Sequence, residues 1–101
     1  MSLWKNSVMT TFYHSYASDE TPCAVKIDQG GILVEYETSE NGLTTLRQYQ
    51  GENDGTGHFR LTMTAEGSSG KATLHMFPSA QLLVGNWVEN SMRGMWSIAL
   101  A

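Results

Sequence analysis

Turn-forming residues interrupt this chain at intervals of about ten positions, and short runs rich in β-branched and aromatic residues lie between them. The turn segments are Gly30-Gly31, Asn41-Gly42, residues 53–57, residues 66–70, Pro78-Ser79 and Asn90-Ser91. Within the runs, apolar and polar residues alternate, as in Phe59, Arg60 and Leu61. A period of two is typical of strands with one buried face, so the pattern predicts an antiparallel β-meander.

The last hairpin carries the strongest register signal, because Gly-x-Trp occurs on both of its strands. If Asn90-Ser91 is a two-residue loop, the expected pairs are Trp87 with Gly94 and Trp96 with Gly85. An indole ring over a glycine shields bare backbone and fixes the register of the pair. The pattern therefore predicts a hairpin that helps to close and fill a curved sheet.

Two earlier hairpins extend the same inner face. With Gly30-Gly31 as a loop, the expected pairs are Lys26 with Glu35, Val25 with Tyr36 and Ile27 with Val34. With Asn41-Gly42 as the next loop, the expected pairs are Thr38 with Thr45, Tyr36 with Arg47 and Val34 with Tyr49. The other face is charged and polar, apart from Leu33 and Leu46, so a slip of one residue would bury the charges.

The first segment, residues 4–16, fits two kinds of element. A strand would point every second residue inward: Val8, Thr10, Phe12, His14 and Tyr16. A helix would align every fourth: Trp4, Val8, Phe12 and Tyr16. The Thr, Tyr and Phe content of the segment favours the strand.

With that strand the chain holds about eight, and an open meander of this size would expose its edges. We therefore predict one all-β domain over residues 1–101, an antiparallel up-and-down β-barrel. A short N-terminal helix in place of the first strand is the alternative. An eight-stranded barrel is either filled by side chains or just wide enough for one small ligand.

Four motifs in the predicted barrel resemble a known group. They are Gly57-His58-Phe59, residues 72–78, residues 83–87 and Arg93-Gly94-Met95-Trp96. In these motifs and in strand order over residues 22–100, the chain resembles the calycin group, and most of all small bacterial lipocalin-like domains whose role is not established. The resemblance implies a barrel with room for a central ligand, and it names no particular ligand.

The composition of the chain restricts the classes of partner and the cellular location that we expect. Six basic against ten acidic residues give a net charge of −4, which is the wrong sign for a surface that neutralises phosphates, so we expect no nucleic-acid partner. No secretion signal and no run of about 20 apolar residues occurs, so we expect no membrane association and a cytoplasmic location. Cys23, the single cysteine, suits a reducing compartment and is expected to be a small core residue.

Arg47 is the main candidate for a functional residue, because the predicted register points it inward between Tyr36 and Tyr49. A buried guanidinium is costly unless a carboxylate, a ligand anion or an aromatic face accompanies it. The functional interpretation is that these three residues form the polar end of a ligand cavity, with Trp87 and Trp96 as its walls. The alternative is that Arg47 stacks on a tryptophan at the closed end of a filled barrel.

No catalytic set or metal site can be assembled from the residue spacing. His58 and His75 are expected on outward faces of neighbouring strands, His14 lies in the ambiguous first segment, and no metal-ligand spacing joins them. Glu52, Asn53 and Asp54 do not follow a calcium-loop pattern. We therefore expect no catalytic residue, no metal and no cofactor, and enzymatic activity is the weakest interpretation.

Two functions remain. The first is a binding module that holds a small, partly apolar ligand inside the barrel, and with Arg47 present the ligand could be anionic. The second is an interaction domain with a filled barrel that forms homo-oligomers. Its interface would use the outer apolar residues of the last hairpin: Leu82, Val84, Val88, Met95 and Ala99.

Overall fold

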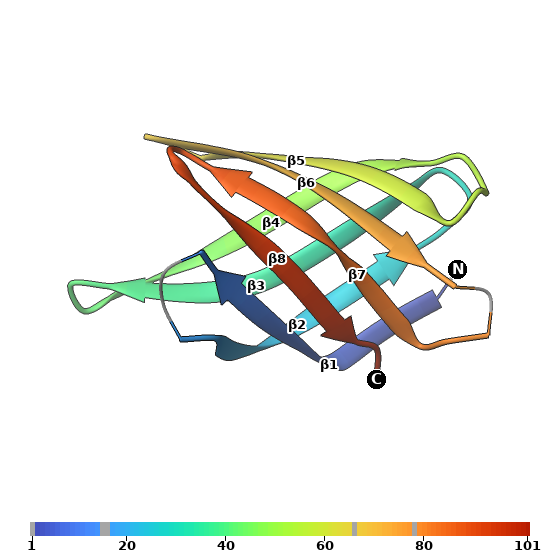
Figure 1. The fold of residues 1–101 in the computed structure, drawn as a ribbon, viewed down its shortest axis with the longest axis horizontal. Coiled ribbons are helices and arrows are strands. Elements are labelled where there is room, and N and C mark those ends of the chain that lie inside the picture. The colour runs from blue at the N-terminus through green and yellow to red at the C-terminus, as the bar shows by residue number, and fades with distance from the viewer. Residues whose placement is uncertain (1, 15–16, 66, 78) are drawn as a thin grey trace.

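A computed structural model describes residues 2–14, 17–65, 67–77 and 79–101, and Figure 1 shows its fold. The strands are β1 (Ser2–Tyr13), β2 (Asp19–Ile27), β3 (Gly31–Glu40), β4 (Leu43–Asn53), β5 (His58–Ala65), β6 (Ser68–Met76), β7 (Leu82–Glu89) and β8 (Met92–Ala99). Each strand pairs antiparallel with the next, and β1 pairs with β8. The predicted all-β, up-and-down barrel is confirmed, with a strand and not a helix at its start.

Two of the three predicted hairpin registers are confirmed. The observed pairs include Trp87 with Gly94, Trp96 with Gly85, Tyr36 with Arg47, Val34 with Tyr49 and Thr38 with Thr45. The turns between these strands use left-handed backbone at Asn41 (φ 53°), Gly42 (φ 79°) and Asn90 (φ 57°). Asparagine and glycine enter this region at little cost, and two-residue hairpin loops require it, so local turn chemistry set both registers.

The β2–β3 hairpin differs from its prediction, because its loop is Gln29-Gly30 and not Gly30-Gly31. The side chain of Asp28 causes the shift: its Oδ1 accepts hydrogen bonds from the backbone N–H of Gly30 at 2.9 Å and of Gly31 at 2.8 Å. The N–H of Asp28 also donates to the carbonyl of Gly31 at 3.0 Å. This Asx turn closes the hairpin one residue early.

The three predicted β2–β3 pairs are accordingly wrong. In place of Lys26 with Glu35, Val25 with Tyr36 and Ile27 with Val34, the pairs are Lys26 with Leu33, Val25 with Val34 and Ile27 with Ile32. Each partner moves by two positions, which leaves the inward and outward faces unchanged. The alternation of apolar and polar residues was enough to predict which side chains of β2 and β3 point inward. The pairing partners across the hairpin depended on the carboxylate of Asp28.

The predicted inner face of β1 is also wrong. Of the residues expected inside, Val8, Phe12 and His14 are exposed and Thr10 is half-buried, while Tyr16 lies outside the described residues. The buried residues are Ser7, Met9 and Thr11. Both faces of this strand carry apolar residues, so alternation cannot choose between them. A β-bulge between Trp4 and Ser7, together with pairing to β2 and β8, makes the choice.

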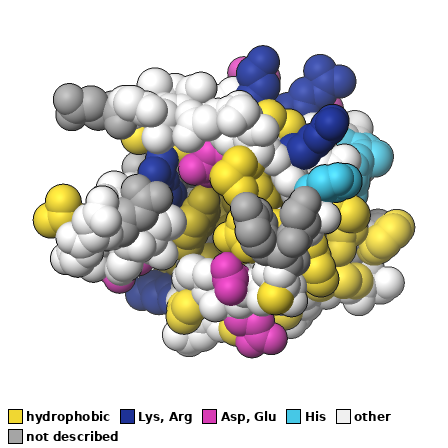
Figure 2. Space-filling view, turned by 60° about the vertical axis from the view of Figure 1, so that its left-hand side comes forward, with side chains coloured by type: hydrophobic (Ala, Val, Ile, Leu, Met, Phe, Trp, Pro, Cys, Tyr) yellow, Lys and Arg dark blue, Asp and Glu magenta, His cyan; other side chains and the backbone are white. Residues whose placement is uncertain are grey.

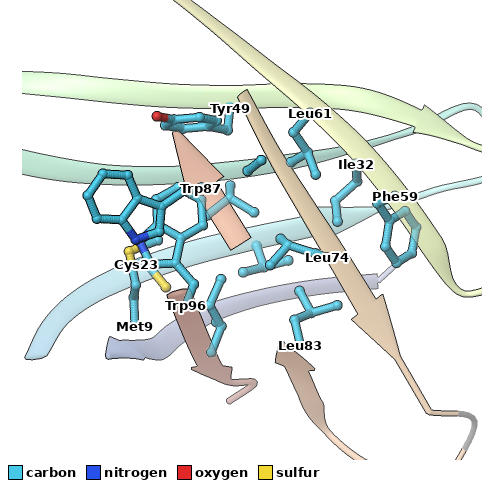
Figure 3. Close-up of a cluster of buried hydrophobic side chains, with 14 of the residues drawn as sticks. Met9, Cys23, Ile32, Tyr49, Phe59, Leu61, Leu74, Leu83, Trp87 and Trp96 are labelled. Carbon is cyan, nitrogen blue, oxygen red and sulfur yellow. The ribbon is translucent and has the colours of Figure 1, made fainter. Parts of the chain in front are cut away.

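One end of the barrel, called the closed end, is filled by side chains. It carries the β2–β3, β4–β5 and β6–β7 connections. Figure 3 shows the aliphatic and phenyl side chains that fill it gathered on one side of the core, among them Ile32, Phe59, Leu61, Leu74 and Leu83. All five are buried.

The opposite end, called the open end, is less completely paired. There the outer parts of β3 and β4, residues 37–46, project as a two-stranded arm, at the left of Figure 1. The β2–β3 register stops at Cys23 with Tyr36, and the β4–β5 register starts only at Gln50 with Thr62. Thr45, expected inside, is exposed because the arm extends past the barrel wall.

The described residues include no helix long and apolar enough to cross a membrane.

Candidate functional site

A layer of aromatic rings separates the filled core from the open end. Neighbouring rings lie 5.7 Å apart between Tyr13 and Trp87, 6.3 Å between Trp87 and Trp96, 4.9 Å between Trp96 and Tyr49 and 6.5 Å between Tyr49 and Tyr36. These centroid spacings are those of favourable edge-to-face and stacked pairs. Trp87, Trp96 and Tyr49 are buried, whereas Tyr13 and Tyr36 are partly exposed. The layer, here called the aromatic floor, therefore presents two tyrosines to the open end.

Two glycines make room for the aromatic floor. A Cβ atom on Gly94 would lie 2.8 Å from Cζ2 of Trp87, and one on Gly70 would lie 2.2 Å from the hydroxyl of Tyr49. The ring of Trp87 thus covers the glycine opposite it, as the sequence predicted. Gly85 differs, because the three atoms nearest its Cβ position belong to the β6 backbone at Thr73 and Leu74.

Above the floor, three strands contribute one polar network. The hydroxyl of Tyr49 on β4 donates a hydrogen bond of 2.8 Å to Oε2 of Glu89 on β7. Nη1 of Arg47 lies 3.8 Å from Oε1 of the same carboxylate and 3.7 Å from the sulfur of Met63 on β5. The side chains of Arg47 and Glu89 are only 14% and 23% exposed. Arg47 therefore spans the gap where β4 and β5 are unpaired.

The guanidinium is not fully satisfied by these contacts. Its Nε is buried and has no hydrogen-bond partner among the described residues. Its contacts are with Glu89 and Met63 at the open end, not with the closed end that the alternative interpretation required. The ion pair is long and one N–H donor is unused, so Arg47 can donate a hydrogen bond to a further acceptor if its side chain turns.

The aromatic floor and this network lie at the base of a cavity of about 660 Å³ that opens to solvent. Its walls come from the ends of β1, β3 and β7 and the starts of β2, β4, β6 and β8. We call it the cup. Figure 2 brings this end of the molecule forward and shows hydrophobic side chains deep in a hollow with acidic side chains around it. Its volume falls within the range of known small-molecule sites.

The charge of the cup is strongly negative. Four carboxylates line it against one guanidinium: Asp19, Glu20, Glu37 and Glu89 against Arg47. Three of these acids are exposed at the rim, and Glu89 alone lies near the floor. The formal charge of the lining is therefore −3, which attracts cations and repels anions.

The two tyrosines beside Arg47 are held in the protonated state. Burial raises the pKa of Tyr49 far above its ordinary value of 10.0, and its hydrogen bond to Glu89 raises it further. Burial likewise raises the pKa of Tyr36, with Glu89 adding to the effect. Both hydroxyls can donate hydrogen bonds at neutral pH, and neither is a candidate base or nucleophile.

The structure brings the five predicted site residues together at one level of the barrel. Arg47 and Tyr36 line the cup directly, Trp87 and Trp96 form part of its base, and Tyr49 lies below through its bond to Glu89. Glu89 was missed by the sequence analysis, because Arg47 and Glu89 are far apart in the chain and on strands that do not pair. Its position one residue before the Asn90 turn, at the same end as Arg47, was the available signal.

The remaining candidates for reactive or metal-binding residues are one cysteine and two histidines. Cys23 is buried, and its burial raises the pKa of the thiol to about 11, so it is protonated and unreactive near neutral pH. His58 and His75 do lie outward on neighbouring strands, as predicted. Across the described part of the chain, no group of three or more His, Cys, Asp or Glu side chains is arranged to hold a metal ion.

Comparison of this chain with models of protein families, with the sequences of curated proteins and with solved structures gave no match.

Proposed function

We propose that this protein binds a small molecule in the cup. The observation that carries the proposal is the abrupt change inside one barrel, from a filled hydrophobic core to a cavity of about 660 Å³ above the aromatic floor. A barrel that serves only as a scaffold gains stability by filling this volume, and a cavity with aromatic side chains and a few convergent polar groups is typical of ligand sites. The closed eight-stranded topology also supports the proposed likeness to lipocalin-like domains.

The lining defines the class of ligand. Aromatic faces at the base favour a flat or apolar group, and the carboxylates favour a cationic or hydrogen-bond-donating group. The sequence analysis left an anionic ligand open because of Arg47. Arg47 is already 3.8 Å from Glu89, and three further carboxylates surround the entrance, so an anion would meet net repulsion. We therefore propose a small aromatic amine or a neutral aromatic molecule.

Three probes of one shape and different charge test this proposal. Phenethylamine, 2-phenylethanol and 3-phenylpropionate share a phenyl ring on a two-carbon chain and differ in the terminal group. Each is titrated into the protein labelled with ¹⁵N, and the indole N–H signals of Trp87 and Trp96 report on the floor. We expect the amine to bind about fivefold more tightly than the carboxylate, because a partly solvated charge contact contributes up to about 1 kcal/mol.

Glu89→Gln should reduce this preference, and Glu52→Gln serves as its control, because Glu52 is exposed and is not part of the cup lining. Both changes remove one negative charge, so a general charge effect would act equally in the two variants. The proposal fails if none of the three probes moves the two indole signals. The proposed charge preference fails if 3-phenylpropionate binds as well as phenethylamine.

A second function, self-association, is favoured by an independent observation on the outside of the barrel. Apolar side chains line the seam where β1 meets β8: Phe12 is 46% exposed and pairs with Met95, which is 53% exposed. Val8 on β1 and Val88 on β7 are also apolar and are 40% and 49% exposed. We call these four residues the seam patch. We propose that a second copy of this chain covers the seam patch, since exposed clusters of large apolar side chains often mark protein–protein interfaces.

Sedimentation velocity over a range of concentrations tests self-association. Met95→Glu should abolish the concentration dependence of the sedimentation coefficient. Leu43→Glu should leave it unchanged, because Leu43 is equally apolar and is 72% exposed, but lies at the tip of the arm away from the seam patch. A wild-type protein that stays monomeric at the highest concentration would refute this second function.

A further inference from the structure

The β5–β6 hairpin sets two histidines directly opposite each other. Ala65 pairs with Ser68, and the same register pairs His58 with His75 near the closed end. The backbone N–H of Met76 donates to the carbonyl of Gly57 at 2.8 Å, so the neighbouring pair, His58 with His75, is a non-hydrogen-bonded pair. Opposite side chains approach most closely at such pairs. The strand register of the β5–β6 hairpin therefore places the two imidazole rings side by side.

The two rings face each other through the same kind of nitrogen. Nδ1 of His58 lies 2.5 Å from Nδ1 of His75, the ring centroids are 4.6 Å apart, and the ring planes are nearly perpendicular at 82°. In a hydrogen bond between two imidazole nitrogens, one carries a proton and the other presents a lone pair. Replacing that proton by a metal ion leaves two lone pairs directed at one point between the strands.

The spacing of the nitrogens suits a shared ion. Two nitrogens bound to one ion at about 2.0 to 2.1 Å lie about 2.9 Å apart at right-angle geometry and about 3.4 Å apart at tetrahedral geometry. The separation of 2.5 Å must then widen by about 0.4 to 0.9 Å, and rotation of the two exposed side chains can supply this because no core packing holds them.

The surroundings of the pair are ordered and carry negative charge. Thr56 donates to Oδ1 of Asp54 from both its N–H, at 3.0 Å, and its hydroxyl, at 2.6 Å, while the N–H of His58 donates to the hydroxyl of Thr56 at 3.3 Å. These bonds fix the backbone on which His58 lies. Asp54 is close enough to His58 for the two to interact electrostatically, and it would offset part of the charge of a bound cation.

We propose that His58 and His75 form a surface site for a divalent transition-metal ion, with water completing its coordination. Imidazole nitrogens favour Cu²⁺, Ni²⁺ and Zn²⁺, and Cu²⁺ binds such ligands most tightly of the three. Ca²⁺ and Mg²⁺ prefer oxygen ligands and are excluded. The site lies at the closed end, so it is independent of the cup and of the proposed small-molecule function.

Isothermal titration of the untagged protein with CuSO₄ or ZnCl₂ tests this site. We expect one ion per chain, and no heat of binding with CaCl₂ or MgCl₂. His58→Gln and His75→Gln should each weaken Cu²⁺ binding by about tenfold or more, because only one imidazole then remains at the site. His14→Gln is the control, since His14 is the third exposed histidine and follows β1 at the opposite end of the barrel.

A second measurement needs no variant. Substoichiometric Cu²⁺ broadens the NMR signals of nuclei close to it, so the imidazole signals of His58 and His75 should vanish together before that of His14. Equal broadening of all three histidines, or equal Cu²⁺ affinity in the three variants, would overturn the proposal. Loss of binding in only one of the two pair variants would also overturn it, because the site requires both rings.

Discussion

Tyr49 on β4 and Glu89 on β7 are joined across the barrel by a hydrogen bond of 2.8 Å, although 40 residues separate them in the chain. The bond marks the level at which the hydrophobic interior ends, because Tyr49 is fully buried below it and Glu89 is partly exposed above it. Gly70 lies against the hydroxyl, and a Cβ atom at this position would lie only 2.2 Å from it. The base of the cup is thus defined by one polar contact.

Tyr49→Phe is expected to destabilise the protein by about 1.5 kcal/mol, because it removes a hydrogen bond to a charged group that is partly shielded from water. Urea denaturation followed by tryptophan fluorescence measures the change. Tyr36→Phe is the matched control, since among the described residues its hydroxyl has no hydrogen-bond partner, and it should change stability by less than about 0.5 kcal/mol. Equal effects would show that the Tyr49–Glu89 bond contributes nothing specific.

Gly94→Ala is expected to destabilise the protein by about 2 to 3 kcal/mol through overpacking. Its new Cβ would lie 2.0 Å from the carbonyl oxygen of Phe12 and 2.8 Å from Trp87, and the backbone atom cannot move aside cheaply. In Gly30→Ala the nearest atom is a side-chain oxygen of Asp28 at 3.7 Å, so that variant should be close to neutral. The thermal unfolding midpoints of the two variants are compared. Equal midpoints would show that Gly94 is not packed against Phe12 and Trp87 as described.

The Arg47–Glu89 ion pair is expected to contribute little to stability, in contrast to the hydrogen bond beside it. Its separation of 3.8 Å and partial exposure to solvent predict a coupling energy below about 1 kcal/mol. A double-mutant cycle with Arg47→Gln and Glu89→Gln, measured by urea denaturation, gives this energy directly. A coupling of about 3 kcal/mol or more would mean that water is excluded from the pair.

Stability is expected to fall as the pH rises above 9. The ordinary pKa of the Cys23 thiol is 9.0, and burial raises it to about 11, so between these values the unfolded chain loses a proton that the folded chain keeps. The stabilisation is complete below pH 9 and disappears as the pH passes 11. Burial of Tyr36 and Tyr49 acts in the same direction from pH 10 upward.

Cys23→Ala isolates the thiol contribution, because it should flatten the fall in unfolding free energy between pH 9 and 10 while leaving the tyrosine contribution in place. The same burial predicts slow reaction of Cys23 with iodoacetamide at pH 8 and fast reaction in urea. A native thiol that reacts as quickly as the unfolded one would contradict the buried position.

The hairpins show which parts of the fold a sequence can specify. Asn41-Gly42 and Asn90-Ser91 were sufficient to place Arg47 opposite Tyr36 and Trp87 opposite Gly94, because few residues tolerate left-handed backbone and the turn fixes the register of both strands. Gly30-Gly31 looked equally clear, yet the carboxylate of Asp28 selected a different loop. A side chain that accepts hydrogen bonds from the turn backbone can move the turn away from the position that the glycines favour. The alternation of apolar and polar residues does not reveal this effect.

β1 shows the complementary limit. Phe12 and Met9 lie on opposite faces of one strand, and either could have been buried. Local alternation offers no preference there, so the choice depended on the bulge and on two neighbouring strands. The apolar seam patch on β1 follows from the same choice, and the sequence analysis recognised only its β7 and β8 part.

By itself, the sequence determined the barrel, the pairing of Arg47 with Tyr36 on one hairpin and the pairing of Trp87 with Gly94 on another. These features follow from turn chemistry and from a side-chain period of two, which act within a hairpin. Closure of the barrel decided the rest: the Glu89 partner of Arg47 and the acidic cup. Contacts across a barrel depend on strand stagger summed around the ring, and no single hairpin contains that information.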